Sequence, residues 1–310
     1  CGIIFGNDST IRAGVEAVDT ARKYNETHYI GAGYIFKAMN STITMNLAAH
    51  FKTRGANWTI SAACASGAHV IGQALMMIRS GMQDTIIAGA AQETNWMSMA
   101  SFDSLNAFST RIDSPEQASR PFDRDRDGLV PGGGGGCIVI EDLDHALARG
   151  AHIYCIIDGY GFSSGIGGTL SEPNQEGSET AMVNALKDAG ITPGDVDYIN
   201  AHATSTRGGD LAEAVAISRV FGPDTPVSST KSMTGHECWM SGTSEVIYTI
   251  LMANNGFIAP NINFAGLSDG CPPIRVIPET VSGRIGYAVS NSFGFGGTNA
   301  AVVLNFREQG

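Results

Sequence analysis

Short runs rich in Val, Ile and other apolar residues alternate along the chain with longer Ala-rich stretches in which apolar positions recur every three or four residues. The first pattern is typical of buried strands and the second of helices with one buried face. Residues 65–80 show the helical pattern, with Gly81 as its stop signal, and residues 58–62 and 85–89 flank them as strands. This alternation predicts an α/β fold whose helices cover both faces of its sheets.

The same criteria predict further elements in both parts of the chain. Strands are expected at 2–6, 153–159, 196–200, 285–290 and 300–305, and helices at 142–149, 178–189 and 211–221. The helix 142–149 ends at Gly150, where a new series of strands and helices begins. We therefore expect two parts, residues 1–150 and residues 151–310. Because no long linker of Pro and Ser separates them, we expect them to share a core.

The composition narrows the classes of partner. The chain has 310 residues, of which 43% are hydrophobic, so it can bury a substantial core. A net charge of −11 argues against nucleic acid or an anionic membrane as the main partner, because both require a cationic face. No apolar run reaches the length that a membrane helix requires. We expect neither a nucleic-acid nor a membrane partner.

The cysteines favour a reducing compartment. There are six, and they are scattered without a CxxC pair: Cys1, Cys64, Cys137, Cys155, Cys238 and Cys271. This spacing suggests neither a zinc site nor a disulfide framework. A cytoplasmic setting fits best.

The sequence SAACASG at residues 61–67 places Cys64 at the junction of an expected strand and an expected helix. Its small neighbours would let a substrate approach the sulfur. The N-terminus of a helix has free N–H groups and a partial positive charge, which favour a thiolate and can bind an oxyanion. On this motif alone, a nucleophile and an inert core cysteine are both open interpretations.

Two further segments place histidines among small polar residues. His202 lies in NAHATST (200–206), directly after an expected strand, and so points into a polar loop. The segment STKSMTGH (229–236) adds Lys231 and His236. Catalytic roles compete here with a hydrogen-bonded loop histidine, a solvated lysine and a capping histidine.

The segment SNSFGFGGTNA (290–300) follows a strand and is dense in Gly. Such a loop brings backbone N–H groups close to a ligand or moves as a gate. As a nucleotide-binding fingerprint it is weak, because it lacks the GxGxxG spacing and a following helix.

Two other motifs imitate known sites. The sequence DRDRDG (123–128) resembles the start of a calcium loop, but the twelfth position is Gly134 where a Glu is required, so we interpret it as a structural turn. The five glycines at 132–136 are not a phosphate-binding loop, since no Gly-Lys-Ser/Thr follows. We expect tight packing there, and neither a metal nor a cofactor.

Four of these motifs occur together in the order and approximate spacing seen in β-ketoacyl-acyl-carrier-protein synthases. They are SAACASG, AHATST, TKSMTGH and SNSFGFGGTNA. The whole chain resembles this family. It is most similar to the type I and II elongating class, also through RPFD (120–123), RDG (126–128) and residues 143–153. Two histidines, rather than His and Asn, argue against the type III initiating class. The retained Cys64 argues against a chain-length-factor subunit.

The resemblance implies a thiolase-like fold, layered αβαβα, made of two similar halves that both contribute to the active site. It also implies a homodimer. The family has about a hundred residues before the strand at 2–6, so the N-terminal half is expected to lack its first strands. The implied reaction is the decarboxylative condensation of malonyl-acyl carrier protein with an enzyme-bound acyl group, which extends a fatty-acid or related polyketide or polyene chain by two carbons.

The resemblance also implies residue roles. Cys64 would take the acyl chain, with the backbone N–H groups of Cys64 and Phe295 as the oxyanion hole. His202 and His236 would hydrogen-bond the malonyl thioester carbonyl and stabilise the enolate, a task that suits neutral imidazoles. Lys231 and Glu213 would form a supporting buried pair.

Substrate contacts follow in the same way. By similarity, Thr204 and Thr206 contact the pantetheine arm of the acyl carrier protein, Phe293 gates the acyl pocket, and Phe102 falls at an acyl-pocket position.

The sequence departs from the family pattern at two places near the histidines. Ala203 replaces the usual Gly, which is tolerated if its φ is negative. After His236 the family usually has small residues, whereas this chain has ECWMSG (237–242), so packing there should differ and substrate specificity is in doubt.

Two alternatives stay open. A thiolase acting on coenzyme A thioesters usually needs a second catalytic Cys near the C-terminus, and none follows Cys271. A non-catalytic ketosynthase-like partner subunit would bind a carrier protein or a second ketosynthase without turnover.

Overall fold

The computed structural model describes residues 1–165 and 169–307, and two sheets organise it. The first has four strands in the order β2-β1-β3-β4. Strands β1, β2 and β3 run parallel, and β4 pairs antiparallel with β3. Their bounds are Gly2–Gly6 (β1), Asn57–Ile60 (β2), Thr85–Gln92 (β3) and Gly134–Glu141 (β4).

The second sheet has six strands in the order β5-β12-β11-β6-β7-β9. Its bounds are Ile156–Ser164 (β5), Tyr198–Asn200 (β6), Pro226–Ser228 (β7), Arg275–Val276 (β9), Tyr287–Gly294 (β11) and Thr298–Asn305 (β12). The short strands β8 (Phe257–Ile258) and β10 (Val281–Ser282) pair separately. All strands of the first sheet precede those of the second in the chain. The domain boundary near Gly150 remains a prediction that this arrangement supports.

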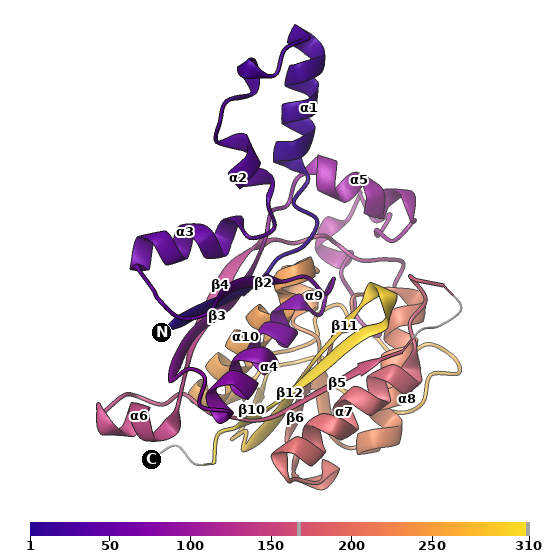
Figure 1. Ribbon diagram of the computed structural model, residues 1–310. Helices are drawn as coiled ribbons and strands as arrows, with labels where there is room; N and C mark the ends of the chain where they lie inside the picture. Colours follow the sequence, from indigo (N-terminus) through magenta and orange to yellow (C-terminus); the bar gives the residue numbers. More distant parts are fainter. Residues whose placement is uncertain (166–168, 308–310) are drawn as a thin grey trace.

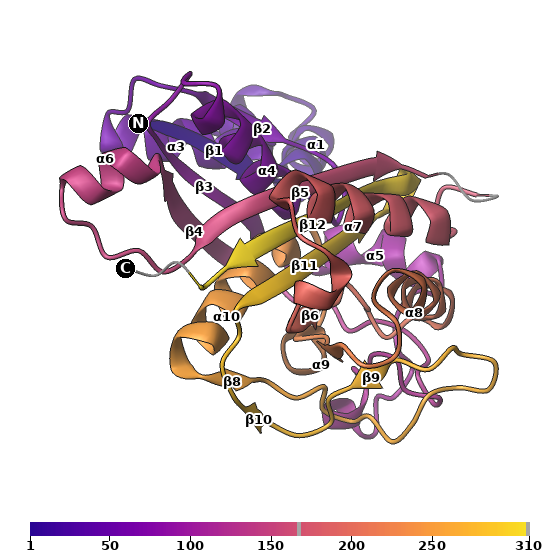
Figure 2. The ribbon, with the colours of Figure 1, turned by 90° about the horizontal axis from the view of Figure 1, so that it is seen from below.

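Helices complete five layers, as Figures 1 and 2 show. Helices α4 (Ser66–Arg79) and α10 (Ser241–Asn255) lie between the two sheets and contact strands of both. On the outer face of the second sheet lie α7 (Gln175–Ala189) and α8 (Arg207–Phe221), and α3 (Thr42–Phe51) packs on β1 and β2. The αβαβα layering implied by the sequence resemblance is confirmed.

The remaining helices are shorter or lie outside the stack of layers, except that η4 is buried against β3 and α4. Helices α1 and α2 project from the body together with η1, as Figure 1 shows. The bounds are Arg12–Tyr24 (α1), His28–Ile30 (η1), Tyr34–Ala38 (α2), Trp96–Ser104 (α5), Pro115–Gln117 (η2), Leu143–Ala148 (α6), Pro193–Asp195 (η3), Lys231–Thr234 (α9), Cys238–Met240 (η4) and Phe295–Gly297 (η5). Among the described residues, no helix has both the length and the apolar character that crossing a membrane requires.

The core explains why α4 is central. Its apolar face, including Val70 and Ile71, is fully buried against Ile4 and Ile86 of the first sheet and Val302 of the second. A second core cluster lies between the second sheet and the outer helices α7 and α8. Burial on both sides fixes the N-terminal end of α4, which begins directly after Cys64, in the middle of the molecule.

The sequence-predicted elements all overlap observed ones, with shifted boundaries. For example, β2 ends at Ile60 rather than residue 62, and α8 begins at Arg207 rather than residue 211. The sequence patterns do not predict β4, α5 or α10. The glycines that begin β4 disfavour strands on their own, and pairing with β3 determines this strand instead.

Candidate active site

Cys64 lies in a tight turn between β2 and α4. Ala63 has a φ of 46°, which an L-residue adopts only when its surroundings hold it there. The Ala63 N–H donates to Asp8 Oδ2 (3.1 Å), and the Ser66 hydroxyl donates to the Ala63 carbonyl while accepting from the Ala62 N–H. Gly6 lets β1 approach this turn closely, because an added Cβ would lie 2.9 Å from the Ser66 carbonyl carbon.

The Cys64 side chain is buried, and burial raises the pKa of its thiol to about 12, although Lys231 acts in the opposite direction. The thiol is therefore protonated at neutral pH in the free site. A base must take the proton before the sulfur can attack a carbonyl.

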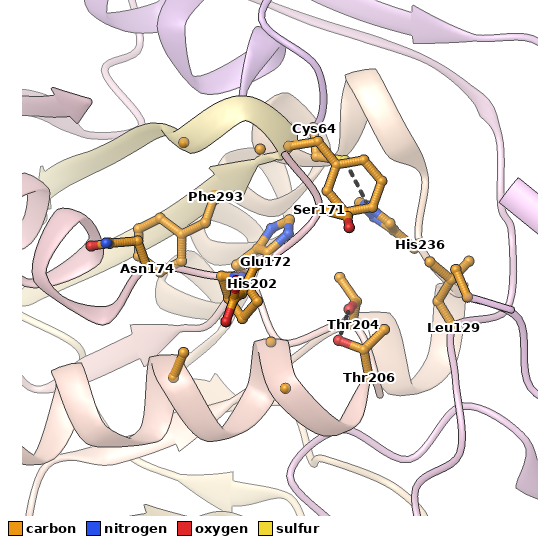
Figure 3. Close-up of a pocket in the computed structure, with 18 of the residues that line it drawn as sticks. Cys64, Leu129, Ser171, Glu172, Asn174, His202, Thr204, Thr206, His236 and Phe293 are labelled. Atoms are coloured by element: carbon orange, nitrogen blue, oxygen red, sulfur yellow. Dashed lines mark hydrogen bonds between the residues drawn. The ribbon is translucent and has the colours of Figure 1, made fainter. Parts of the chain in front are cut away.

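His236 follows α9 and supplies a ring nitrogen next to the Cys64 thiol. Its Nε2 lies 3.1 Å from the Cys64 Sγ, as the dashed line in Figure 3 marks. Burial lowers the pKa of His236 well below its usual range, and the positive charge of Lys231 nearby lowers it further. A neutral imidazole can present either a bare nitrogen or an N–H at Nε2, depending on its tautomer.

His202 follows β6 and faces the same space. Its ring lies perpendicular to that of His236, with 5.3 Å between the centroids. Burial lowers the pKa of His202 well below its usual range, and electrostatic interactions with Lys231 and His236 lower it further. The structure thus brings together Cys64, His202 and His236, three residues that lie far apart in the sequence, and it keeps both imidazoles neutral.

Glu213 on α8 holds the loop that carries His202. Its two carboxylate oxygens accept from the backbone N–H groups of His202 (2.9 Å) and Ala203 (2.7 Å), and one also accepts from the Asn291 side chain (3.0 Å). Asp210, one turn earlier, accepts from the Thr204 N–H. Burial raises the pKa of Glu213 to about 7.

The predicted pairing of Lys231 with Glu213 is wrong. The Lys231 Nζ donates instead to Glu245 of α10, and both side chains are almost completely buried. Glu213 faces backbone N–H groups because α8 packs along the loop after β6, whereas α10 passes beside α9. An acidic residue on the buried face of a helix of small and apolar residues was the signal for Glu245.

A cavity of about 270 Å³ connects these groups. Figure 3 shows that Cys64 and both histidines line it, together with Thr204 and Thr206, whose hydroxyls are 3.1 Å apart. Lys231 and Glu213 do not line the cavity and lie behind the histidines.

Three phenylalanines line the cavity, one beside His202 and two stacked on each other. Phe293 lies against His202, with 5.9 Å between the ring centroids. Phe295 stacks on Phe102 at 6.0 Å, and all three of these phenylalanines line the cavity. Phe295, rather than Phe293, therefore contacts the residue predicted for the acyl pocket.

The two departures from the family pattern have structural outcomes. Ala203 has a negative φ, so the condition for accepting its side chain is met. The segment after His236 forms η4, with Trp239 and Met240 buried and Cys238 at a φ of 45°. That packing after His236 differs from the family stays a prediction.

The calcium-like sequence is a structural turn, as predicted. Asp123 accepts from the Arg120 side chain and from two backbone N–H groups, and Asp127 accepts from the hydroxyls of Ser109 and Thr110. The nearby glycines pack tightly, since a Cβ added at Gly133 would lie 2.1 Å from the Thr94 hydroxyl oxygen.

Comparisons with known proteins agree with this geometry. Family models of the N-terminal and C-terminal domains of β-ketoacyl synthase match residues 1–146 and 154–265. The chain is 44% identical over 306 residues to "3-oxoacyl-[acyl-carrier-protein] synthase 1" of Escherichia coli K12, covering 98% of this chain and 74% of that protein. The identity to the protein of the same name in Haemophilus influenzae is 45% over 291 residues, or 93% of this chain and 71% of the other.

Solved structures show the same relationship. A β-ketoacyl synthase from Burkholderia phymatum has a TM-score of 0.93 at 36% identity, with 98% of this chain and 74% of that chain covered. A type II polyketide ketosynthase solved with its acyl-carrier protein, AntDE:AntF, has a TM-score of 0.92 at 29% identity, with 98% and 77% covered. This chain belongs to the β-ketoacyl synthase family.

Proposed function

We propose that this chain is a 3-oxoacyl-acyl-carrier-protein synthase, an acyltransferase that uses Cys64 as its nucleophile. The observation that carries the proposal is the contact between the Cys64 Sγ and the His236 Nε2 beside a second neutral histidine in one cavity. The family membership and the names of the relatives support the same reaction.

In the first half-reaction, the Cys64 sulfur attacks the thioester carbonyl of an acyl carrier protein. His236 takes the thiol proton and passes it to the departing pantetheine thiol, so a carbon–sulfur bond forms on Cys64 as the other breaks. The backbone N–H groups of Cys64 and Phe295 would bind the oxyanion. Both residues line the cavity at the start of α4 and at η5.

In the second half-reaction, malonyl-acyl carrier protein loses carbon dioxide. The electron pair of the broken carbon–carbon bond passes to the thioester enolate, which His202 and His236 stabilise as N–H donors. For this step His236 adopts the tautomer with its proton at Nε2. The enolate carbon then attacks the acyl carbonyl on Cys64, and the sulfur leaves as a thiolate that takes a proton from solvent. Neutral rings suit this step because a cation would retain the malonyl carboxylate as an ion pair.

The acyl carrier protein is the partner that this reaction requires. Thr204 and Thr206 line the cavity and would hydrogen-bond the pantetheine arm, Phe102 would contact the acyl group, and Phe293 would gate access. The cytoplasmic setting stays a prediction, and the six free cysteines suit a reducing compartment.

Release of carbon dioxide from malonyl-acyl carrier protein tests the proposed reaction. We expect His202→Ala to lower this release by about 100-fold to 1,000-fold, the usual effect of losing one oxyanion donor. His152→Ala, which removes an exposed imidazole, is the matched control and should leave the rate unchanged. A wild-type protein that condenses acyl-coenzyme A thioesters without releasing carbon dioxide would instead identify a thiolase.

We propose further that the chain forms a homodimer through the β2 edge of the first sheet. Strand β2 is an edge of that sheet, and its Trp58 is exposed. Helix α3, which packs on β2, exposes Phe51, and α2, which contacts α3, exposes Ile35 and Phe36. An open strand edge next to exposed apolar side chains is typical of an interface.

Sedimentation velocity tests the dimer. The wild-type protein should sediment as a dimer. The double variant Ile35→Asp/Phe36→Asp should sediment as a monomer, because the new charges oppose burial of the α2 surface in the interface. Met82→Asp, at an exposed apolar position after α4, should remain dimeric. A wild-type monomer at all micromolar concentrations would contradict the proposal.

A further inference from the structure

The segment after His236 brings a large aromatic side chain next to the nucleophile. Trp239 is 5% exposed and belongs to a buried apolar cluster with Cys64, Met99 and Cys238. Its ring lies 5.9 Å from that of Phe102, measured between centroids. Phe102 in turn stacks on Phe295 and Phe108. Cys64 is thus bordered on one side by packed aromatic rings.

Contacts on both sides hold this segment in place. The carboxylate of Glu237, itself buried, accepts hydrogen bonds from the hydroxyls of Ser244 and Tyr248, which lie one turn apart on α10. Met240 packs against β4, where a Cβ added at Gly134 would lie 3.6 Å from the Met240 Sδ. Trp239 lies between these two anchors and has little freedom to move.

Cys64 borders the open cavity on the side of the histidines. The cavity wall is largely apolar, and its hydroxyls come from Thr204, Thr206 and Ser171. The amides of a pantetheine arm need such hydrogen-bonding groups. An acyl tail is apolar and is best placed where the cavity meets the buried cluster of Met99, Phe102 and Trp239, of which Phe102 also lines the cavity. Trp239 is not among the residues that line the open cavity. Its indole instead fills the space within the buried cluster next to Cys64.

We infer that Trp239 determines acyl-chain specificity and restricts Cys64 to short acyl groups. This inference rests on the proposed function and names its substrate class. Medium and long acyl tails would have to displace an anchored, buried indole, whereas acetyl and butanoyl groups need no such movement. Replacing Trp239 with a small residue opens the apolar side of Cys64 to longer tails.

The test measures the rate at which Cys64 is acylated by acyl carrier proteins loaded with acetyl, butanoyl, octanoyl or dodecanoyl groups. Intact-protein mass spectrometry follows the reaction. The wild-type protein should accept acetyl and butanoyl groups and react about 100-fold more slowly with dodecanoyl groups. In Trp239→Ala the dodecanoyl-to-butanoyl rate ratio should rise about 100-fold, and in Trp239→Leu by a smaller factor.

The ratio of two rates within one variant does not depend on how much of the protein is folded. Trp96→Leu is the matched control, because this tryptophan is 76% exposed at the start of α5, and its ratio should equal that of the wild type. Equal wild-type rates for butanoyl and dodecanoyl groups, or an unchanged ratio in Trp239→Ala, would overturn the inference and leave the proposed function standing. Failure of every acyl group to load on Cys64 would overturn both.

Discussion

Replacing Cys64 with Ala is expected to lower the rate of 3-oxoacyl product formation by at least about 10⁴-fold, since it removes the sulfur that carries the acyl chain. The loss follows from the position of the sulfur at the N-terminal end of α4, 3.1 Å from the His236 Nε2. Carbon dioxide release from malonyl-acyl carrier protein should continue, because the two histidines that stabilise the enolate remain in place. Product analysis by mass spectrometry measures both reactions on the same sample.

Cys137→Ala is the control for this substitution, because it removes an exposed thiol on β4. Its product rate should equal that of the wild type. A Cys64→Ala protein that retains a tenth or more of the wild-type rate would rule out covalent catalysis at this residue. A wild-type protein that forms no 3-oxoacyl product would instead favour the non-catalytic partner that the sequence leaves open.

Replacing Lys231 with Met is expected to destabilise the protein by about 3–5 kcal/mol, because it leaves the Glu245 carboxylate buried without its partner. Burial already raises the pKa of Glu245 to about 8, and Lys231 opposes that rise. Without the lysine the pKa of Glu245 must rise further. Urea unfolding monitored by circular dichroism gives the free energy of unfolding of each protein.

The destabilisation in Lys231→Met should depend on pH in a definite direction. A carboxyl group whose pKa is raised by folding binds more protons in the folded state than in the unfolded state. The favourable contribution of Glu245 to the free energy of unfolding is therefore complete below about pH 4.5. It is lost as the pH rises through about 8 and above. The variant should therefore lose stability relative to wild type as the pH rises through about 8, where Glu245 ionises in the folded wild type but stays protonated in the folded variant.

Two further variants isolate the cause. Lys231→Met/Glu245→Gln removes both charges and should recover much of the stability and lose the pH dependence, because a neutral pair leaves no buried ion. Lys187→Met, at an exposed position on α7, should behave as wild type. If Lys231→Met and Lys187→Met unfold at the same urea concentration, the buried ion pair does not stabilise the fold.

The reactive residues could be predicted from the sequence because their signals are local. Cys64 and His202 each follow a strand recognisable from its apolar run, and small or polar neighbours mark both positions. The ends of strands in α/β sheets are where side chains reach a common space. These signals left the role of each residue open, and the resemblance of the four motifs to one family joined Cys64, His202 and His236 in a single expected site.

The partner of Lys231 could not be predicted from the sequence in the same way. Glu213 and Glu245 are both acidic residues on buried helix faces, and nothing local shows which of them faces the lysine. The choice depends on the packing of α9 against α10, which is a tertiary contact. Similarly, the resemblance identified the segment at 237–242 as unusual, but only the fold shows that Trp239 reaches Phe102 and Cys64.

Strand β4 illustrates a different limit. Three glycines begin it, and isolated glycines favour turns or loops over strands. Its register against β3 runs continuously from Gln92 opposite Gly134 to Thr85 opposite Glu141. The strand therefore exists because its partner pairs with it, which a local pattern does not reveal.

The central claim is that Cys64 carries the acyl group. The most direct measurement is the mass of the intact protein after incubation with butanoyl-acyl carrier protein, followed by peptide mapping. We expect the addition of one butanoyl group on the peptide that contains Cys64, and no addition in Cys64→Ala. An unmodified Cys64, or a butanoyl group on another residue in the wild-type protein, would contradict the central claim.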